Sequence, residues 1–464
     1  MSPSEGRGAA LVAEREEPAL APVAAAGPAA GPRGALQRAS LWLEAEPWRL
    51  PLLMAVVAAL FRLPGLGLPA EEVFDEVYHA KTALQYLQGL PPVEWVHPPT
   101  AKLLIAIGVA LFGYVPWAWR LLPALAGIAL APVYFLLARE VTGRARPTLL
   151  AAVLLLCDGV YLVQSRIAMT NIFAVLFQVS SALLVLRAVR RERLPLGLMV
   201  GAGFTLGLAL STRWTSLWAW GFMGLVLLVG RRRRLWTLRE LVISQYTFVL
   251  IPVFVYLLSY YPWMRQQNFD LSSLDGIIAM LGELVRLQKA IWHYHATLNA
   301  THPYFSKWWT WPALYRPTWY HFKVHEGWIR GIVAIGNPAL WWASVPITLW
   351  ALVTGLRARD WRRIYCGAGF VCLYVPWGIS PRTLNYSHYL FEAIPYSCLS
   401  LALLLDRWWD DEAQRWTARG YVALTVLLFF FFLPFLAAIP VPESWYYFRI
   451  VGGVRPWTWF RTWV

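Results

Sequence analysis

Long apolar runs recur along this 464-residue chain, and they constrain its fold more than any other feature. The runs lie at residues 50–68, 99–113, 117–138, 148–163, 168–188, 195–211, 214–229, 241–261, 338–356, 364–379, 386–405 and 419–440. Since 58% of the residues are hydrophobic and only 14% are charged, too few polar groups remain to cover a water-soluble domain. Lipid offers no hydrogen-bond partners to the backbone, so these spanning segments must be helical. We therefore expect an all-α polytopic membrane protein.

The basic residues between the apolar runs predict how the chain is threaded through the membrane. They cluster at residues 139–146, 187–193, 231–234, 357–363 and 407–419. Such clusters mark the cytoplasmic face, so the formal net charge of +15 indicates orientation and not binding to nucleic acid. All clusters face the cytoplasm if run 99–113 lies in the outer leaflet as a juxtamembrane helix. The chain then has about 11 transmembrane helices, a cytoplasmic N-terminus and an external C-terminus.

The first 45 residues differ in composition from the rest. Residues 1–45 are rich in Ala, Pro and Gly with charges of both signs, which predicts a disordered cytoplasmic tail before a membrane domain at 46–464. The tail lacks a compact apolar core, so we do not expect a cleaved signal peptide. The cysteines, which lie in or near apolar runs and form no CxxC pair, predict neither a metal site nor a disulfide framework; they are Cys157, Cys366, Cys372 and Cys398.

The predicted threading gathers polar residues in the external loops at 71–116 and 262–337. The first loop contains "FDEVYHAKTALQYL", residues 74–87, in which apolar positions recur at helical spacing. Asp75 and Glu76 would lie in the first turn of this amphipathic helix. They are either a charged helix start or a general base that accepts a proton from a hydroxyl group.

Several cations share the external face. The stretch "WVHPPTAK" places His97 and Lys102 in the first loop, and Arg166 stands at the outer start of an apolar run. An arginine there either extends its side chain to the interface or binds a lipid phosphate through its planar fork. Arg316 and Arg382 are further candidates for phosphate binding.

The segment "IWHYHATLNATHPYFSKWWTWPALYRPTWYH", residues 291–321, interleaves histidine with aromatic side chains. Its candidate substrate-binding residues are His293, His295, His302, Trp308, Trp309 and Trp311. The i, i+4 histidine spacing of a helical zinc motif is absent, so metal binding is not favoured. The aromatic rings either pack at the membrane interface or form a platform for a sugar and its lipid chain.

Four of these stretches, in this order, resemble the protein O-mannosyltransferase family of the GT-C glycosyltransferase superfamily: "FDEVYHA", "HPPTAK", "LVQSRIAMTNIF" and "YHATLNATHPYFSKWWTWP" with the following "RPTWY". The resemblance covers most of residues 50–450. It implies a GT-C fold and transfer of mannose from a polyprenyl phosphate to Ser or Thr hydroxyls of exported proteins. Asp75 and Glu76 occupy the positions of the family's acidic pair, and Arg166 matches its arginine.

The chain departs from the family pattern in two places. Asn171 stands where the family usually has an aspartate, so any role of that carboxylate is lost or relocated. Residues 262–337 leave no room for the MIR domain of eukaryotic members, so the chain resembles the shorter bacterial form, which implies the bacterial plasma membrane. Acceptor recognition must then rely on the membrane core and its short loops, or on a partner such as the secretion machinery.

The reaction that these residues suit is a single displacement with inversion at the sugar. Asp75 would take the hydroxyl proton while cations stabilise the departing phosphate, so no cofactor is required, although Glu76 and a histidine could hold a divalent metal. One alternative is a GT-C enzyme with another polyprenyl-phosphate sugar, or with a lipid or polysaccharide acceptor. A transporter or flippase is disfavoured, because its polar residues should lie at mid-membrane in repeated, interrupted helices.

Overall fold

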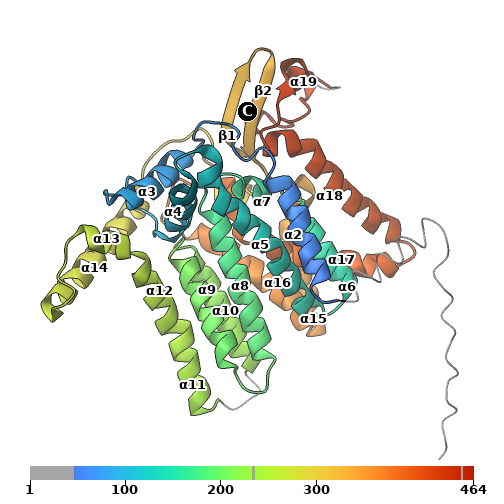
Figure 1. Cartoon of the computed structure of the whole chain (residues 1–464). Helices are drawn as coiled ribbons and strands as arrows, with labels where there is room; N and C mark the ends of the chain where they lie inside the picture. Colours follow the sequence, from blue (N-terminus) through green and yellow to red (C-terminus); the bar gives the residue numbers. More distant parts are fainter. Residues whose placement is uncertain (1–45, 232–235, 451–452, 464) are drawn as a thin grey trace, which may run out of the picture. The chain divides into compact units, whose positions relative to one another are not determined.

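The computed structural model describes residues 46–231, 236–450 and 453–463, so the predicted tail at 1–45 lies outside the described residues. Residues Leu50–Val464 form one compact unit, which contains the helical bundle and a small sheet. Figure 1 shows the helices, which are α2 (Arg49–Arg62), α3 (Glu76–Gln88), α4 (Thr100–Phe112), α5 (Pro116–Thr142), α6 (Ala145–Leu156), α7 (Gly159–Gln164), α8 (Asn171–Val189), α9 (Leu196–Leu210), α10 (Ser216–Arg231), α11 (Leu238–Gln245), α12 (Ile251–Ser259), α13 (Tyr261–Gln266), α14 (Leu274–Thr297), α15 (Pro338–Ala358), α16 (Trp361–Tyr374), α17 (Ile394–Asp410), α18 (Arg415–Leu436) and α19 (Glu443–Tyr447).

The helices confirm the predicted all-α multi-pass class. Among the described residues, five helical segments are long and apolar enough to cross a membrane, namely α5, α8, the continuous segment Leu238–Ser259, α15 and α18. Four shorter apolar helices, α4, α6, α9 and α10, accompany them. The number of about 11 spans stays a prediction, because length and composition alone do not establish which of the shorter helices cross. The amphipathic helix predicted after Asp75 is α3.

One predicted span is broken by a buried acid. The apolar run at 148–163 divides into α6 and α7, and Asp158 lies at the break. Its carboxylate accepts hydrogen bonds from the backbone N–H of Tyr161 at 2.9 Å and from Nε1 of Trp341 at 2.7 Å. Asp158 therefore caps the first turn of α7 and ties it to α15.

Ion pairs gather three of the basic clusters at one end of the helical bundle. Arg144 contacts Asp406 at 2.6 Å, and Arg146 contacts Asp410 at 2.6 Å, so the clusters at 139–146 and 407–419 meet. Arg187 and Arg190 both contact the carboxylate of Glu140, at 2.9 and 2.8 Å. The clusters thus share one end of the bundle, which is the arrangement that the predicted threading requires.

A small antiparallel sheet was not expected from the sequence. Strand β1 (Thr318–His325) pairs with β2 (Trp328–Ala334), and β2 pairs with the two-residue strand β3 (Val441–Pro442). Glu326 and Gly327 form the tight turn, with φ of 49° and 77°. Positive φ at both central residues is the requirement of a type I′ hairpin turn. The dipeptide Glu-Gly between alternating apolar residues was the available signal, although Asn-Gly or Asp-Gly is the usual one.

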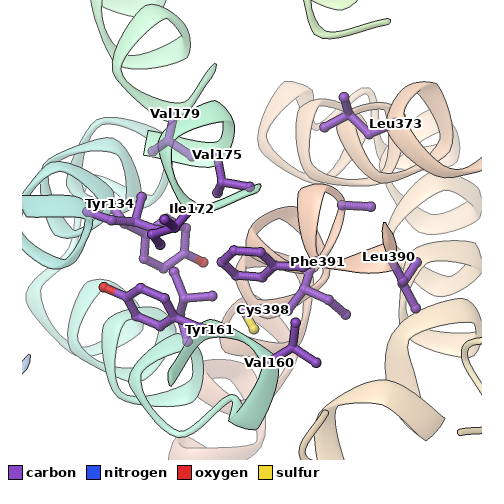
Figure 2. Packing of buried hydrophobic residues seen from close by; sticks show 14 of the residues in the cluster. Tyr134, Val160, Tyr161, Ile172, Val175, Val179, Leu373, Leu390, Phe391 and Cys398 are labelled. Atoms are coloured by element: carbon purple, nitrogen blue, oxygen red, sulfur yellow. The ribbon is translucent and has the colours of Figure 1, made fainter. Parts of the chain in front are cut away.

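Aromatic packing at the centre of the unit holds three separate segments together (Figure 2). Tyr161 of α7 stacks on Phe391 at a centroid distance of 5.8 Å, and the hydroxyl of Tyr134 in α5 donates to the carbonyl of Pro395 at 2.6 Å. Ile172 and Val175 of α8 enter the same cluster. The first turn of α8 and the segment before α17 are therefore anchored side by side.

A buried ion pair fixes the loop before α3 to the bundle. Arg120 of α5 donates from Nε and Nη2 to the two carboxylate oxygens of Glu76, at 2.8 and 2.7 Å, and both side chains are fully buried. The same carboxylate accepts from the backbone N–H groups of Val73 at 3.0 Å and Ala168 at 2.8 Å. Arg120 also donates to the carbonyl of Pro69 at 2.7 Å. Both charges are thus paired and hydrogen-bonded, which a buried ion pair needs.

This geometry predicts a large loss of stability for Glu76→Gln. The variant leaves the Arg120 guanidinium buried without its counter-charge, which typically costs about 3–5 kcal/mol. We expect a clearly lower midpoint of thermal unfolding for the purified protein in detergent. The neighbouring variant Asp75→Asn is the matched control and should leave the midpoint unchanged. Equal midpoints for Glu76→Gln and wild type would contradict the structural role of this pair.

Candidate active site

A pocket of about 540 Å³ gathers polar residues from segments that are far apart in the sequence. Its walls come from the start of α3, the loop at 93–97, the start of α8, the turn between α9 and α10, and the segments at 294–302 and 382–389. The polar and aromatic side chains that line it are Phe74, Asp75, Tyr78, His79, Glu94, Trp95, His97, Thr170, Asn171, Arg213, Tyr294, His302, Arg382, Tyr386, His388 and Tyr389.

Asp75 enters the pocket from the residue that precedes α3. Within the described part of the chain its carboxylate makes no hydrogen bond or ion pair, and it does not cap the helix. Phe74 just before it has a φ of 50°, in the left-handed region that residues other than glycine rarely adopt. The Phe74 ring stacks on Tyr320 at 4.2 Å and meets the edge of Tyr386 at 5.8 Å. These contacts hold the strained backbone that directs Asp75 into the pocket.

The surroundings of Asp75 favour proton uptake. Burial raises the pKa of its carboxyl group above the ordinary value, and the charge of Glu94 adds to this effect. His79, Arg382 and Arg213 act in the opposite direction but leave the pKa raised. An unpaired carboxylate with a raised pKa is a suitable general base, because its proton affinity is higher than that of an ordinary aspartate.

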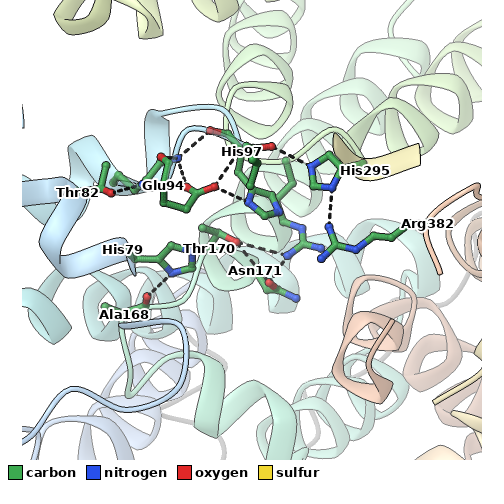
Figure 3. A network of polar contacts seen from close by, with 12 residues as sticks. His79, Thr82, Glu94, His97, Ala168, Thr170, Asn171, His295 and Arg382 are labelled. Atoms are coloured by element: carbon green, nitrogen blue, oxygen red, sulfur yellow. Dashed lines mark hydrogen bonds and ion pairs between the residues drawn. The ribbon is translucent and has the colours of Figure 1, made fainter. Parts of the chain in front are cut away.

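Glu94 is the second acid in the pocket, and it is neutralised by its neighbours (Figure 3). Its carboxylate forms an ion pair with Lys102 and accepts from Nδ1 of His97 at 2.8 Å. Although burial alone would raise the pKa of Glu94, Lys102 and His97 hold it well below the usual range. Lys102 is fully buried and also donates to the carbonyl of His97 at 2.7 Å. This network fixes the loop between α3 and α4 and leaves Asp75 as the free acid.

Two arginines face the pocket from opposite segments. Arg213, in the turn between α9 and α10, donates from Nη1 to the side-chain oxygen of Asn171 and to Thr170 at 3.4 Å. Arg382 donates from Nε to the carbonyl of Leu384 at 2.9 Å. Both guanidinium groups approach the ring of Tyr389, at 4.9 and 6.0 Å from its centroid. Among the described residues, Nη2 of each arginine has no hydrogen-bond partner, so both keep donors for a ligand.

His295 of α14 orients Arg382. Its Nδ1 accepts from Nη1 of Arg382 at 2.9 Å, and its Nε2 lies 2.8 Å from the carbonyl of Val96. A carbonyl only accepts, so the ring proton belongs on Nε2. Burial lowers the pKa of His295 to about 4, and Arg382 contributes to the shift, so the ring is neutral at pH 7. The ring also lies 5.2 Å from that of His97, which joins α14 to the first loop.

Four of the predicted catalytic and phosphate-binding residues do not line the pocket; they are Glu76, Lys102, Arg166 and Arg316. Glu76 and Lys102 are buried in the ion pairs described above. Nη1 of Arg166 donates to the carbonyls of Phe61, Arg62 and Pro64, each at 2.9 Å, so its fork holds the end of α2. Glu76 and Arg166 thus hold segments of the chain together, and the catalytic and phosphate-binding roles predicted for them stay predictions.

The aromatic segment at 291–321 contributes less to the pocket than its composition suggested. His302 lines the pocket, His295 supports it, and His293 is exposed on α14. Trp311 is fully buried behind the wall, where it contacts Trp377 and Tyr389 at 5.3 and 6.0 Å. Trp308 packs on Tyr374, and Trp309 is 57% exposed. None of the three tryptophans lines the pocket, and their predicted role in substrate binding stays a prediction.

Sequence reasoning missed Arg213, Glu94, His79 and Tyr389. Arg213 had an available signal, because a single cation separates two apolar runs on the side predicted to be external. Glu94 had none, since its importance depends on the ion pair with Lys102. In the described residues, no group of three or more His, Cys, Asp or Glu side chains is arranged to hold a metal ion.

The chain has the GT-C fold of multi-pass membrane proteins. The structure is similar to that of the S. cerevisiae protein O-mannosyltransferase Pmt1–Pmt2 complex bound to the sugar donor, with a TM-score of 0.71 and 15% identity over 84% of this chain and 90% of that chain. Apo ArnT from Cupriavidus metallidurans is also similar, with a TM-score of 0.57 and 17% identity over 86% of this chain and 77% of that one. At these identities the likeness concerns the fold alone.

Sequence comparisons identify the family. The sequence-family model described as dolichyl-phosphate-mannose-protein mannosyltransferase matches residues 52–119 and 115–266. A second family model, described as the C-terminal four TMM region of protein-O-mannosyltransferase, matches residues 280–463. The chain is 30% identical to the polyprenol-phosphate-mannose–protein mannosyltransferase of Mycolicibacterium smegmatis, over 86% of this chain and 91% of the relative. It is 29% identical to the Mycobacterium tuberculosis protein of the same name, over 94% of this chain and 96% of that protein. The chain belongs to the protein O-mannosyltransferase family, as its motifs predicted.

The raised pKa of Asp75 predicts a measurable protonation behaviour. A carboxyl group whose pKa is raised keeps its proton to a higher pH than an ordinary one, so reagents selective for the protonated form should react with Asp75 at higher pH. We expect carbodiimide labelling of Asp75, followed by peptide mass spectrometry, to persist to a higher pH in the folded protein than in the protein unfolded by denaturant. If Asp75 loses reactivity at the same pH in both states, the raised pKa is refuted.

Proposed function

We infer that this protein transfers mannose from a polyprenyl-phosphate-mannose donor to Ser or Thr hydroxyls of acceptor proteins. The observation that carries the inference is the unpaired carboxylate of Asp75 in a pocket with two arginines, in a chain of the protein O-mannosyltransferase family. A carboxylate supplies the base that the acceptor needs, and the guanidinium groups supply the positive charge that the leaving phosphate needs.

Asp75 acts on the acceptor. Its carboxylate takes the hydroxyl proton of Ser or Thr while the hydroxyl oxygen forms a bond to the anomeric carbon of mannose. The bond from that carbon to the phosphate oxygen breaks in the same step, and its electrons leave with the polyprenyl phosphate. A single displacement inverts the anomeric centre, so a β-linked donor gives an α-linked product. Glu94 cannot share the task, because Lys102 and His97 already neutralise it.

Arg213 and Arg382 act on the donor phosphate. Phosphate is a good leaving group that requires charge stabilisation more than a proton, and arginine forks suit its oxygens. Both arginines keep Nη2 free, whereas Arg166 donates to four backbone carbonyls. We therefore assign donor binding to Arg213 and Arg382 in place of Arg166.

The contact between Asn171 and Arg213 supports the assignment of donor binding to Arg213. Its side-chain oxygen accepts from Arg213 as a carboxylate at that position would, but it carries no charge. The carboxylate of Glu392, 3.5 Å from Nε of Arg213, is the nearest acid that the structure records for this guanidinium. The asparagine therefore holds Arg213 in place without adding a second negative charge beside that of Glu392, and Nη2 of Arg213 stays available for the phosphate.

We further propose that the pocket opens on the external face of a bacterial plasma membrane, with the N-terminus in the cytoplasm. The basic clusters at the end of the bundle away from the pocket support this orientation, since such clusters favour the cytoplasm. The proposed steps use no metal, and transfer that survives a chelator would support this point. Coupling of the acceptor to the secretion machinery stays a prediction.

The experiment that tests the function is transfer of radiolabelled mannose from polyprenyl-phosphate-mannose to a Ser- and Thr-rich peptide. We expect label on the peptide with the purified wild type and at least a hundredfold less with Asp75→Asn, in keeping with the usual contribution of a general base. Transfer by the variant at the wild-type rate would remove Asp75 from the base role. Label in lipid or polysaccharide, and none in peptide, would favour the alternative acceptors.

Arginine variants separate the binding roles. Loss of one hydrogen-bonded charge contact to phosphate typically costs about 1.5–3 kcal/mol, so Arg213→Gln and Arg382→Gln should each raise the KM for the donor by about 10- to 100-fold. The KM for the peptide should change little. Arg166→Gln is the control and should lower the unfolding midpoint without a selective effect on the donor. A donor KM that changes only in Arg166→Gln would reverse the assignment.

A further inference from the structure

A second cavity, of about 970 Å³, lies between the ends of helices α8, α10 and α16. We call it the basal groove. It is lined by Leu186, Val189, Arg190, Phe222, Leu225, Val226, Val229, Gly230, Leu356, Arg359, Trp361, Ile364, Tyr365 and Ala368. No residue of the catalytic pocket belongs to it, so the groove is a separate feature of the fold.

The basal groove lies at the end of the bundle opposite the catalytic pocket. Helix α8 connects the two sites, because Asn171 at its start lines the pocket and Val189 at its end lines the groove. At 1.5 Å per residue these positions are roughly 27 Å apart, close to the thickness of the bilayer's hydrocarbon core. The groove therefore meets the membrane interface on the face away from the transfer reaction.

The walls of the groove suit an acyl chain. Phe222 and Leu186 form a buried apolar floor, and Leu225 and Val229 stand along the wall with 47% and 49% of their surface exposed. Side chains of this kind on a membrane helix face lipid tails and not water. Trp361 lies at the mouth, in the position that interfacial tryptophans favour.

The mouth of the groove carries a surplus of positive charge. Arg190 shares the carboxylate of Glu140 with Arg187, so one acid faces two guanidinium groups. Arg190 also lies over the ring of Trp361, at 5.1 Å from its centroid. The guanidinium of Arg359 has no hydrogen bond or ion pair to any residue that the structure describes. An anionic group at the mouth would supply the missing counter-charge.

The backbone conformation of Arg359 at the end of α15 also bears on the charge at the groove. Helix α15 ends there in the left-handed conformation, with a φ of 53°, where glycine or asparagine is usual. The arginine therefore occupies a position that disfavours long side chains, and it places its cation beside the groove. Asn is compatible with the same conformation, which makes Arg359→Asn a substitution that removes the charge and keeps the helix end.

We propose that the basal groove binds an anionic glycerophospholipid. One acyl chain lies along Phe222, Leu225 and Val229, and the phosphodiester contacts Arg190 and Arg359. Basic pockets between transmembrane helices are suited to anionic headgroups, and a zwitterionic headgroup would not neutralise the surplus charge. The proposal does not rest on the transfer reaction, because the groove and the catalytic pocket share no residue.

Native mass spectrometry of the delipidated protein, titrated with phosphatidylglycerol or phosphatidylcholine, tests the proposal. We expect wild type to retain phosphatidylglycerol selectively and Arg359→Asn to bind it about fivefold more weakly, the effect of one basic residue near a membrane surface. The control Arg239→Gln removes an exposed charge of α11 that does not line the groove and should bind as wild type does. Equal losses in both variants would overturn the site, because they would indicate a diffuse charge effect.

A second variant tests the apolar part of the groove. Leu225→Trp enlarges a half-exposed wall residue and should reduce phosphatidylglycerol retention while the unfolding midpoint stays that of wild type. Unchanged retention would place the lipid elsewhere. Equal binding of phosphatidylcholine by wild type would overturn the charge selection. Displacement of phosphatidylglycerol by equimolar polyprenyl phosphate would overturn the lipid class and assign the groove to the isoprenoid.

Discussion

The buried ion pair between Glu76 and Arg120 is the interaction on which the site depends. One carboxylate joins the loop before α3, the start of α5 and the turn before α8, through contacts of 2.7–3.0 Å. These three segments carry Asp75, the adjoining wall of the bundle and Asn171. Because buried charges are costly unless fully paired, the geometry has little freedom. The position of Asp75 is therefore fixed by the adjacent residue Glu76, although Glu76 itself does not line the pocket.

Charge pairing divides the polar residues near the pocket into two groups. Glu76 with Arg120 and Glu94 with Lys102 cancel each other, and both pairs hold segments together. Among the described residues, Asp75 and Arg382 form no ion pair, and Arg213, whose Nε pairs with the buried Glu392, keeps Nη2 available to the cavity. A group with a full set of partners has little to offer a substrate, whereas an unpaired group can accept a proton or bind a phosphate. The same distinction separates the paired arginines at the far end of the bundle from Arg359.

The motif residues show where sequence reasoning succeeded and where it could not. Asp75, His97, His302 and Arg382 were chosen from the sequence, and the structure brings all of them to one pocket. Arg166 was chosen on equal grounds, yet backbone carbonyls of α2 and the residues after it take up its donors. The residues that carry these carbonyls precede Arg166 by 102 to 105 positions in the chain. Sequence position alone could not tell an arginine that binds ligand from one that closes a helix end.

The sequence by itself determined the membrane class, the helices, the family and the position of the acid Asp75. These features depend on hydropathy, on helical periodicity and on short motifs, all of which are local properties. Only the tertiary structure decided which acid is unpaired, which arginines line the pocket and where the basal groove lies. Each of these depends on pairs of residues from distant helices. The free energy of a charge is set by its partners and its burial, and neither is encoded at the position of the charge itself.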